Sequence, residues 1–164
     1  MSTVITGLFD NASQATLAIY RLEALGVSEA DISIVANDSY TKEDFAVDEG
    51  TKAAEGGLLG AASGGVLAAI IGGFTAVGAV ASGGAGLLVA GPFVSALAAG
   101  GAGAAVGGTL GAAIGAFIPE HEIKYYENAI EKGSILVGVK YNSDNKNSIE
   151  EILDNAGASK VSKA

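Results

Sequence analysis

Hydrophobic and polar positions divide the chain into two regularly patterned flanks around a long centre of small and apolar residues. The N-terminal flank begins with a β-rich run at 3–9, and the pair Asp10-Asn11 that follows supplies a typical helix N-cap. Apolar residues then recur with helical spacing over 12–25, and Gly26 suits the position after a helix end. A second β-rich run covers 31–36. This flank therefore predicts a strand, a helix and a strand.

The C-terminal flank repeats this plan. A strand is predicted at 134–141, a helix at 144–155 that stops at Gly157, and a short strand or tail at 159–162. Two β-α-β units on one four-stranded antiparallel sheet predict an α+β fold with a ferredoxin-like domain, the split β-α-β repeat. Neither unit buries enough surface to be stable alone, so residues 37 to 133 must leave from and return to nearly the same place.

The centre predicts a long glycine-zipper α-helical hairpin that interrupts this domain. Small residues recur at every fourth position, which places them on one face of a helix. We expect a helix over 52–80, a glycine-rich loop, and a second helix over 92–118 that follows Gly91-Pro92. Ridges of small residues let helices approach closely. The glycines of the predicted helix-packing ridge are Gly56, Gly60, Gly64, Gly72, Gly103, Gly107, Gly111 and Gly115.

The distribution of charged residues supports the same division into a centre and two flanks. Residues 56–119 form 64 consecutive positions without Asp, Glu, Lys or Arg, while the flanks hold all 18 acidic and 9 basic residues. Each predicted arm is long enough for a bilayer, and Lys52 and Lys124, which flank the outer ends of the two arms, favour cytoplasmic termini. Two other interpretations stay open for this centre: a soluble oligomer in which the hairpins are buried, and a flexible low-complexity segment.

Composition also excludes several function classes. The absence of Cys excludes a disulfide scaffold and a thiol nucleophile, a single His excludes a multi-histidine metal site, and a net charge of −9 argues against nucleic acid as a partner. No phosphate-binding loop or activated serine motif is present, so we predict no enzyme activity, no cofactor and no metal. The densest polar and aromatic cluster includes His121, Tyr125 and Tyr126, which we interpret as residues at a membrane interface.

Three stretches of the chain resemble a known family. They read TVITGLFDNASQATLAIYRLEALGVSEADISIV, KAAEGGLLGAASGGVL and GAAIGAFIPEHEIKYYENAIEKGSILVGV, and the junction from Gly115 to Val137 is the most specific part. Together they resemble the small bacterial general-stress proteins of the heat-induced stress protein type. The resemblance implies a bacterial, membrane-associated protein linked to stress response, with a glycine-zipper centre between α/β flanks. It implies no catalytic residues.

These observations predict a chain of three parts: residues 1–50 and 119–164 as the two halves of the ferredoxin-like domain, and residues 51–118 as the candidate membrane hairpin. We expect a non-enzymatic, self-associating protein of the bacterial cytoplasmic membrane whose hairpin inserts in or coats the bilayer. One alternative is a soluble cytoplasmic ring or cage packed through the glycine ridges. Another, from fold analogy alone, is a regulatory module that binds a small molecule.

Overall fold

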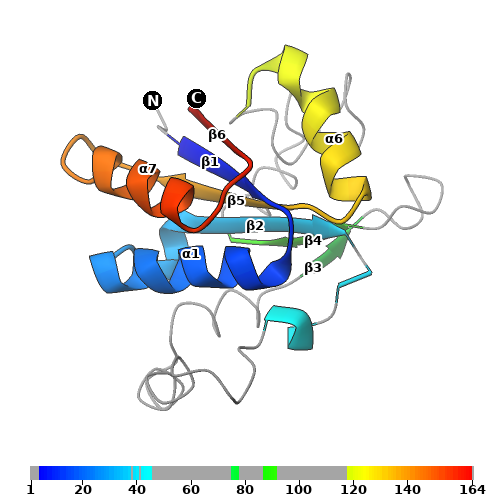
Figure 1. Ribbon diagram of the computed structural model, residues 1–164, viewed down its shortest axis with the longest axis horizontal. Coiled ribbons are helices and arrows are strands. Elements are labelled where there is room, and N and C mark those ends of the chain that lie inside the picture. Colours follow the sequence, from blue (N-terminus) through cyan, green and yellow to red (C-terminus); the bar gives the residue numbers. More distant parts are fainter. Residues whose placement is uncertain are drawn as a thin grey trace.

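The computed structural model of the 164-residue chain describes residues 4–37, 39–40, 42–45, 75–77, 87–91 and 118–163. These residues form a mixed α+β structure (Figure 1). Its strands are β1 (Val4–Phe9), β2 (Ile32–Asn37), β3 (Thr75–Val77), β4 (Leu87–Ala90), β5 (Ile135–Lys140) and β6 (Lys160–Lys163). Its α-helices are α1 (Ala12–Leu25), α6 (Ile123–Glu131) and α7 (Lys146–Asn155), and short 3₁₀ turns occupy Glu29–Asp31 (η1), Lys42–Phe45 (η2) and Glu120–Glu122 (η3).

The described strands form one sheet in the order β3-β4-β2-β5-β1-β6, and every neighbouring pair is antiparallel. The predicted N-terminal unit corresponds to β1, α1 and β2, and the C-terminal unit corresponds to β5, α7 and β6. β5 lies between β1 and β2, so each unit is split by a strand of the other. The two flanks therefore build one sheet together, as the sequence predicted.

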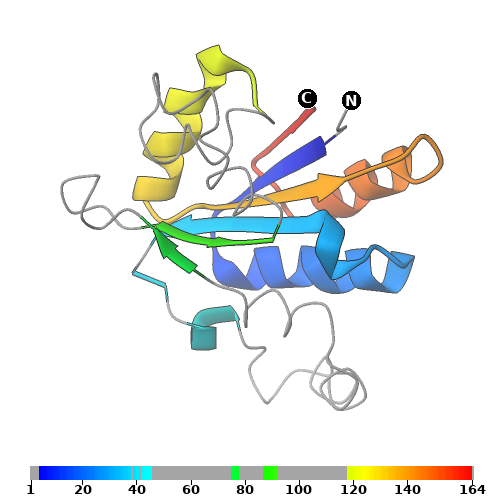
Figure 2. The same ribbon diagram turned by 180° about the vertical axis from the view of Figure 1, so that it is seen from behind.

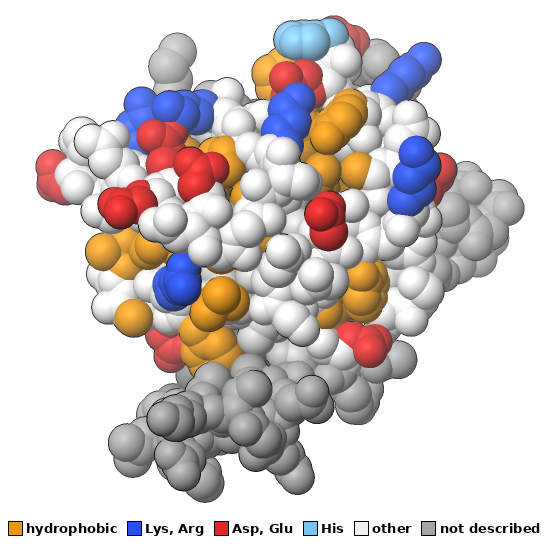
Figure 3. Space-filling view, viewed as in Figure 1, with side chains coloured by type: hydrophobic (Ala, Val, Ile, Leu, Met, Phe, Trp, Pro, Cys, Tyr) orange, Lys and Arg blue, Asp and Glu red, His pale blue; other side chains and the backbone are white. Residues whose placement is uncertain are grey.

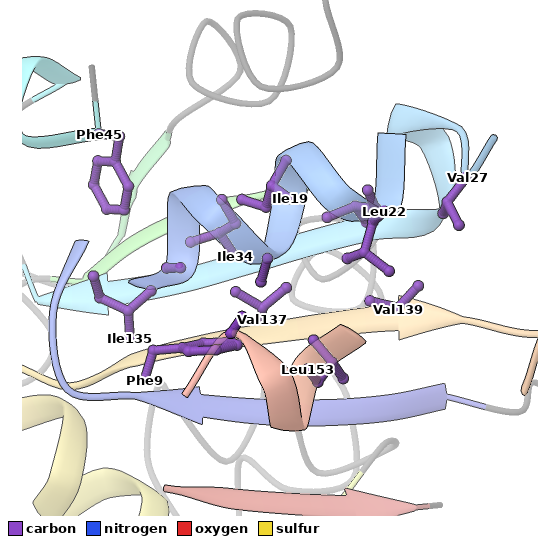
Figure 4. Packing of buried hydrophobic residues seen from close by; sticks show 14 of the residues in the cluster. Phe9, Ile19, Leu22, Val27, Ile34, Phe45, Ile135, Val137, Val139 and Leu153 are labelled. Carbon is purple, nitrogen blue, oxygen red and sulfur yellow. The ribbon is translucent and has the colours of Figure 1, made fainter. Parts of the chain in front are cut away.

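Helices α1 and α7 cover one face of the sheet (Figures 1 and 2). The sequence predicted the limits of α1 closely: the Asn11 side chain accepts a hydrogen bond from the Gln14 amide at 2.9 Å, and Gly26 ends the helix with φ at 92°. Between the helices and the strands lies a core in which Phe9, Ile19, Leu22, Ile34, Val137 and Leu153 are fully buried (Figure 4). Alternate residues of β5 contribute to this core.

The opposite face of the sheet carries α6. Leu136 of β5 and Val35 of β2 point to this side, and together with Tyr126 and Ile130 of α6 they belong to a second buried cluster. The same cluster contains Ile118, which is only 3% exposed, together with Leu87 and Val89 of β4. The described residues thus form three layers: α1 with α7, the sheet, and α6.

Strands β3 and β4 contradict part of the predicted helical hairpin. Residues 75–77 pair as a strand with β4, so the prediction of one helix over 52–80 is wrong at these positions. Residues 87–90, expected in the loop, pair with β2. The sheet therefore has six strands rather than the four predicted. The physical reason is that β2 has an open edge whose backbone groups need partners, and the β-branched Thr75, Val77 and Val89 suit a strand.

The remainder of the predicted hairpin lies outside the described residues. This includes the whole ridge of Gly56, Gly60, Gly64, Gly72, Gly103, Gly107, Gly111 and Gly115. Within the part of the chain that the structure describes, none of the helices has the length and apolar character needed to cross a membrane.

Candidate functional site

The first candidate region is where the chain leaves the sheet after β2. We call Asn37, Tyr40 and Phe45 the exit joint. Asn37 Nδ2 donates a hydrogen bond to the Glu131 carbonyl at 3.2 Å, and the Tyr40 hydroxyl donates to the Gly133 carbonyl at 2.5 Å. Because Glu131 ends α6 and Gly133 precedes β5, the outgoing chain is tied to the returning chain. The prediction that both ends of the insertion meet is confirmed.

Phe45 anchors the far end of the exit joint. Its side chain is fully buried in the core beside α1, its carbonyl accepts a hydrogen bond from Thr16 Oγ1 at 3.2 Å, and its ring lies 5.7 Å from that of Tyr40 (Figure 4). Burial and, to a lesser extent, the carboxylate of Asp44 raise the pKa of Tyr40. The Tyr40 hydroxyl therefore stays a neutral donor over the whole physiological range.

The second candidate region is where the chain returns along η3 and α6 and meets β6. We call it the return joint, and its members are Glu122, Tyr125, Tyr126, Lys160 and Ser162. Lys160 Nζ lies 3.0 Å from Glu122 Oε1. The Tyr126 hydroxyl donates to Ser162 Oγ at 2.8 Å, and Ser162 Oγ donates to Glu122 Oε2 at 3.3 Å. Both carboxylate oxygens of Glu122 are thus engaged by β6.

Aromatic rings complete the return joint around the Lys160 ammonium. Lys160 Nζ lies 4.7 Å from the ring centre of Tyr125 and 5.3 Å from that of Tyr126, and the two rings meet edge to face. The hydrogen bond from Lys160 holds the pKa of Glu122 below its ordinary value, although burial opposes this shift. The same bond raises the pKa of Lys160. Each charge therefore stabilises the other, and together they fasten α6 to the edge strand.

The three residues predicted at a membrane interface differ in their exposure to solvent. His121 is exposed in the η3 turn, and Tyr125 is 50% exposed. Tyr126 is fully buried in the second cluster, so the prediction is wrong for this residue. The physical reason is the helical spacing of Ile123, Tyr126 and Ile130, which places all three on the buried side of α6.

Lys160 and Ser162 are the members of the return joint that the sequence did not indicate. Tyr126 and Ser162 are separated by 36 positions, and no local pattern relates them. Only the register of β6 on β1, in which Ser162 faces Thr6 and Lys160 faces Leu8, places the two residues beside α6. Among the described residues, no three His, Cys, Asp or Glu side chains gather in a group that could hold a metal ion.

The comparisons with known proteins give no match: no protein-family model matches the chain, and neither does a curated protein or a solved structure. The chain is a mixed α+β protein in which one antiparallel sheet carries long inserted segments. The exit joint and the return joint fasten those segments to the sheet at their outer ends.

Proposed function

We propose that the protein is non-enzymatic and self-associating, and that it acts at a bacterial cytoplasmic membrane, with its charge-free segments in or on the bilayer and both termini in the cytoplasm. The observation that carries the proposal is the 64-residue stretch without an ionisable side chain, which lies between two flanking segments that together hold all 27 charged residues (18 acidic and 9 basic). Segments without charge enter a lipid environment at far lower cost than charged ones.

We propose further that β1, α1, β2, β5, α7 and β6 form a ferredoxin-like domain. The strand order β6-β1-β5-β2, with antiparallel neighbours throughout, supports this proposal, as do α1 and α7 on one shared face. β3 and β4 then extend the sheet beyond β2. The resemblance to small general-stress proteins supports a structural role under stress, in which copies of the protein reinforce a membrane.

A soluble homo-oligomer is the second candidate. It is favoured by β3 and β4, since part of the charge-free stretch pairs with the sheet of the charged domain and contributes Leu87 and Val89 to a buried cluster. In this form the glycine ridges of several copies would pack against each other. A small-molecule regulatory role rests on fold analogy alone.

The experiment that tests the proposal is cell fractionation without detergent, followed by particle-mass measurement in buffer and in detergent. Recovery of the protein in the membrane fraction supports the first candidate. Recovery as a monodisperse soluble particle of several copies contradicts membrane association and supports the second. A dilute soluble monomer contradicts both.

A matched pair of variants tests self-association in either form. Gly107→Leu places a bulky side chain on the proposed ridge, and we expect it to reduce the number of copies in the particle because the helices can no longer approach. Ala105→Leu adds a side chain of the same kind two positions away, on a different face of the proposed helix. Equal particle masses for the two variants contradict packing through the ridge.

A further inference from the structure

We infer that two copies of the protein associate edge to edge, with the outer side of β6 paired to β6 of a second copy about a two-fold axis. We call the paired positions 159–163 of the two copies the seam. The inference rests on the proposed function for self-association alone, and it holds with or without a membrane. It names a contact surface in addition to the proposed glycine ridge.

The first observation is that β6 is an edge strand. Among the described strands it pairs with β1 alone, at one end of the sheet (Figures 1 and 2). Each of its four residues is at least partly exposed. The backbone N–H and C=O groups on the outer side of an edge strand are able to bind a further strand. A second copy can therefore extend the sheet at this edge.

The two lysines of β6 are paired within their own copy. Lysine on an edge strand ordinarily opposes pairing with another chain. Here Lys160 Nζ lies 3.0 Å from Glu122 Oε1 on the α6 face, and Lys163 Nζ forms an ion pair with Glu150 of α7 on the other face. Figure 3 shows basic groups directly beside acidic groups in the upper part of the view, where Figure 1 places β6. The edge therefore carries little net charge, although the whole protein has a net charge of −9.

The sequence of the strand suits pairing with itself. Positions 159–163 read Ser-Lys-Val-Ser-Lys. In antiparallel pairing centred on Val161, each lysine faces a serine of the second copy, and Val161 faces Val161 of the second copy. Pairing centred on Lys160 would place two lysines opposite each other, which destabilises a sheet, and pairing centred on Ser162 would lose the apolar pair. The register centred on Val161 is therefore favoured.

Partly exposed apolar side chains lie beside β6 on both faces of the sheet. Val161 is only partly buried against the core on the α7 face. On the α6 face, Tyr125 is 50% exposed, and its ring centre lies 4.7 Å from Lys160 Nζ. Of the large hydrophobic side chains that the structure describes, the other exposed ones are Leu17 and Leu25, both on α1. Pairing through β6 thus brings the Val161 side chains together on one face and places Tyr125 of each copy next to the seam on the other.

The test is disulfide formation between copies of full-length single-cysteine variants, since the chain has no natural Cys. Val161→Cys places two thiols opposite each other at the two-fold axis, where facing Cα atoms lie about 4.5–5.5 Å apart, within the range of a disulfide. Lys163→Cys is the matched control on the same face of the same strand. Its two Cα atoms would lie four positions apart along the strands, or about 14 Å, which is too far for a disulfide. Because Lys163 is half exposed, random collisions would cross-link the control at least as readily.

Particle mass is measured first under reducing conditions, in whichever fraction holds the protein, and the variants are then oxidised. We expect a particle of two or more copies, and at least about tenfold more covalent dimer from Val161→Cys than from Lys163→Cys. A particle of several copies in which Val161→Cys does not cross-link, or in which both variants cross-link equally, overturns the inference and leaves self-association through another surface standing. A monomer under reducing conditions overturns self-association itself, and the seam with it.

A second pair of variants tests the seam without oxidation. Val161→Glu places two carboxylates opposite each other only when the copies pair, and we expect the dissociation constant of the pair to rise by about tenfold or more. Val161→Thr keeps the β-branched shape and should leave it nearly unchanged. Urea denaturation confirms that both variants are folded. A folded Val161→Glu protein whose dissociation constant equals that of Val161→Thr overturns the inference.

Discussion

The two faces of the sheet are held in different ways. On the face of α1 and α7, the buried core is built almost entirely from aliphatic and aromatic side chains. On the face of α6, a smaller apolar cluster is combined with the hydrogen bonds and the ion pair of the return joint. Hydrophobic burial is strong but not directional, whereas hydrogen bonds fix position at a smaller net gain. The first face therefore provides stability, and the second fixes where the inserted segments attach.

The largest expected effect tests the first face. Ile19→Ala removes a fully buried side chain from the core, and we expect a loss of about 2–5 kcal/mol in the free energy of unfolding because a cavity remains. Leu17→Ala on the same helix is the matched control, since Leu17 is 42% exposed and its loss leaves no cavity. Urea denaturation measures both. Equal losses for the two variants would show that α1 does not pack as described.

The next effect concerns the turn after β4. Gly91→Ala introduces both a left-handed backbone strain and a contact with the Ile32 carbonyl, so we expect a loss greater than the roughly 1–2 kcal/mol that the strain alone costs. Hydrogen exchange should show β4 losing protection while α1 retains it. Gly26→Ala provides the control, since its φ is 92° but no atom lies within 4 Å of the added Cβ. Similar losses for both variants would contradict the close approach of Gly91 to β2.

A smaller effect is expected in the return joint. Tyr126→Phe keeps the buried ring and removes the hydroxyl that donates to Ser162 Oγ, and we expect a loss of about 1 kcal/mol in the free energy of unfolding. Tyr125→Phe is the comparison, because it makes the same chemical change on a ring that is half exposed. A larger loss for Tyr125→Phe would mean that Tyr126 is not the residue that holds α6 to β6.

The smallest effect is a dependence on pH. The pKa of Glu122 is lower in the folded protein than in the unfolded chain, so its stabilisation is present above the unfolded pKa, about 4.3, and is lost as pH falls through the folded value. The pKa of Lys160 is raised, so its contribution disappears only as pH rises through the alkaline range. The difference in stability between the natural protein and Glu122→Gln should be under about 1 kcal/mol at neutral pH and vanish in acid. A difference that grows in acid contradicts the ion pair.

The sequence predicted those parts of the fold that are specified by neighbouring residues. The limits of α1 follow from Asn11 and Gly26, and the split arrangement of the strands follows from the repeated pattern of the two flanks. The strands β3 and β4 were missed because they are only three and four residues long and lie within a run of small residues typical of a glycine-rich helix. What specifies them is the open edge of β2, which is distant in the sequence.

The residues of the candidate site could likewise be predicted only where neighbouring residues specify their positions. Tyr126 could have been assigned to the interior from its spacing with Ile123 and Ile130, because one helix face carries all three. The contacts of Glu122 with Lys160 and Ser162 could not, because they depend on the register between β6 and β1. The sequence around Lys160 does not indicate that this residue pairs with the carboxylate of Glu122.

The most direct measurement of the central claim is disulfide formation between β2 and β4. Val35 and Val89 face each other across these strands, and facing Cα atoms in antiparallel strands lie about 4.5–5.5 Å apart, within the range of a disulfide. In the control pair, Val35→Cys with Leu88→Cys, the side chains point to opposite faces of the sheet. The account predicts a disulfide in the Val35→Cys, Val89→Cys protein and none in the control. Failure to cross-link in the first protein, or equal cross-linking in both, would contradict the attachment of the charge-free stretch to the sheet.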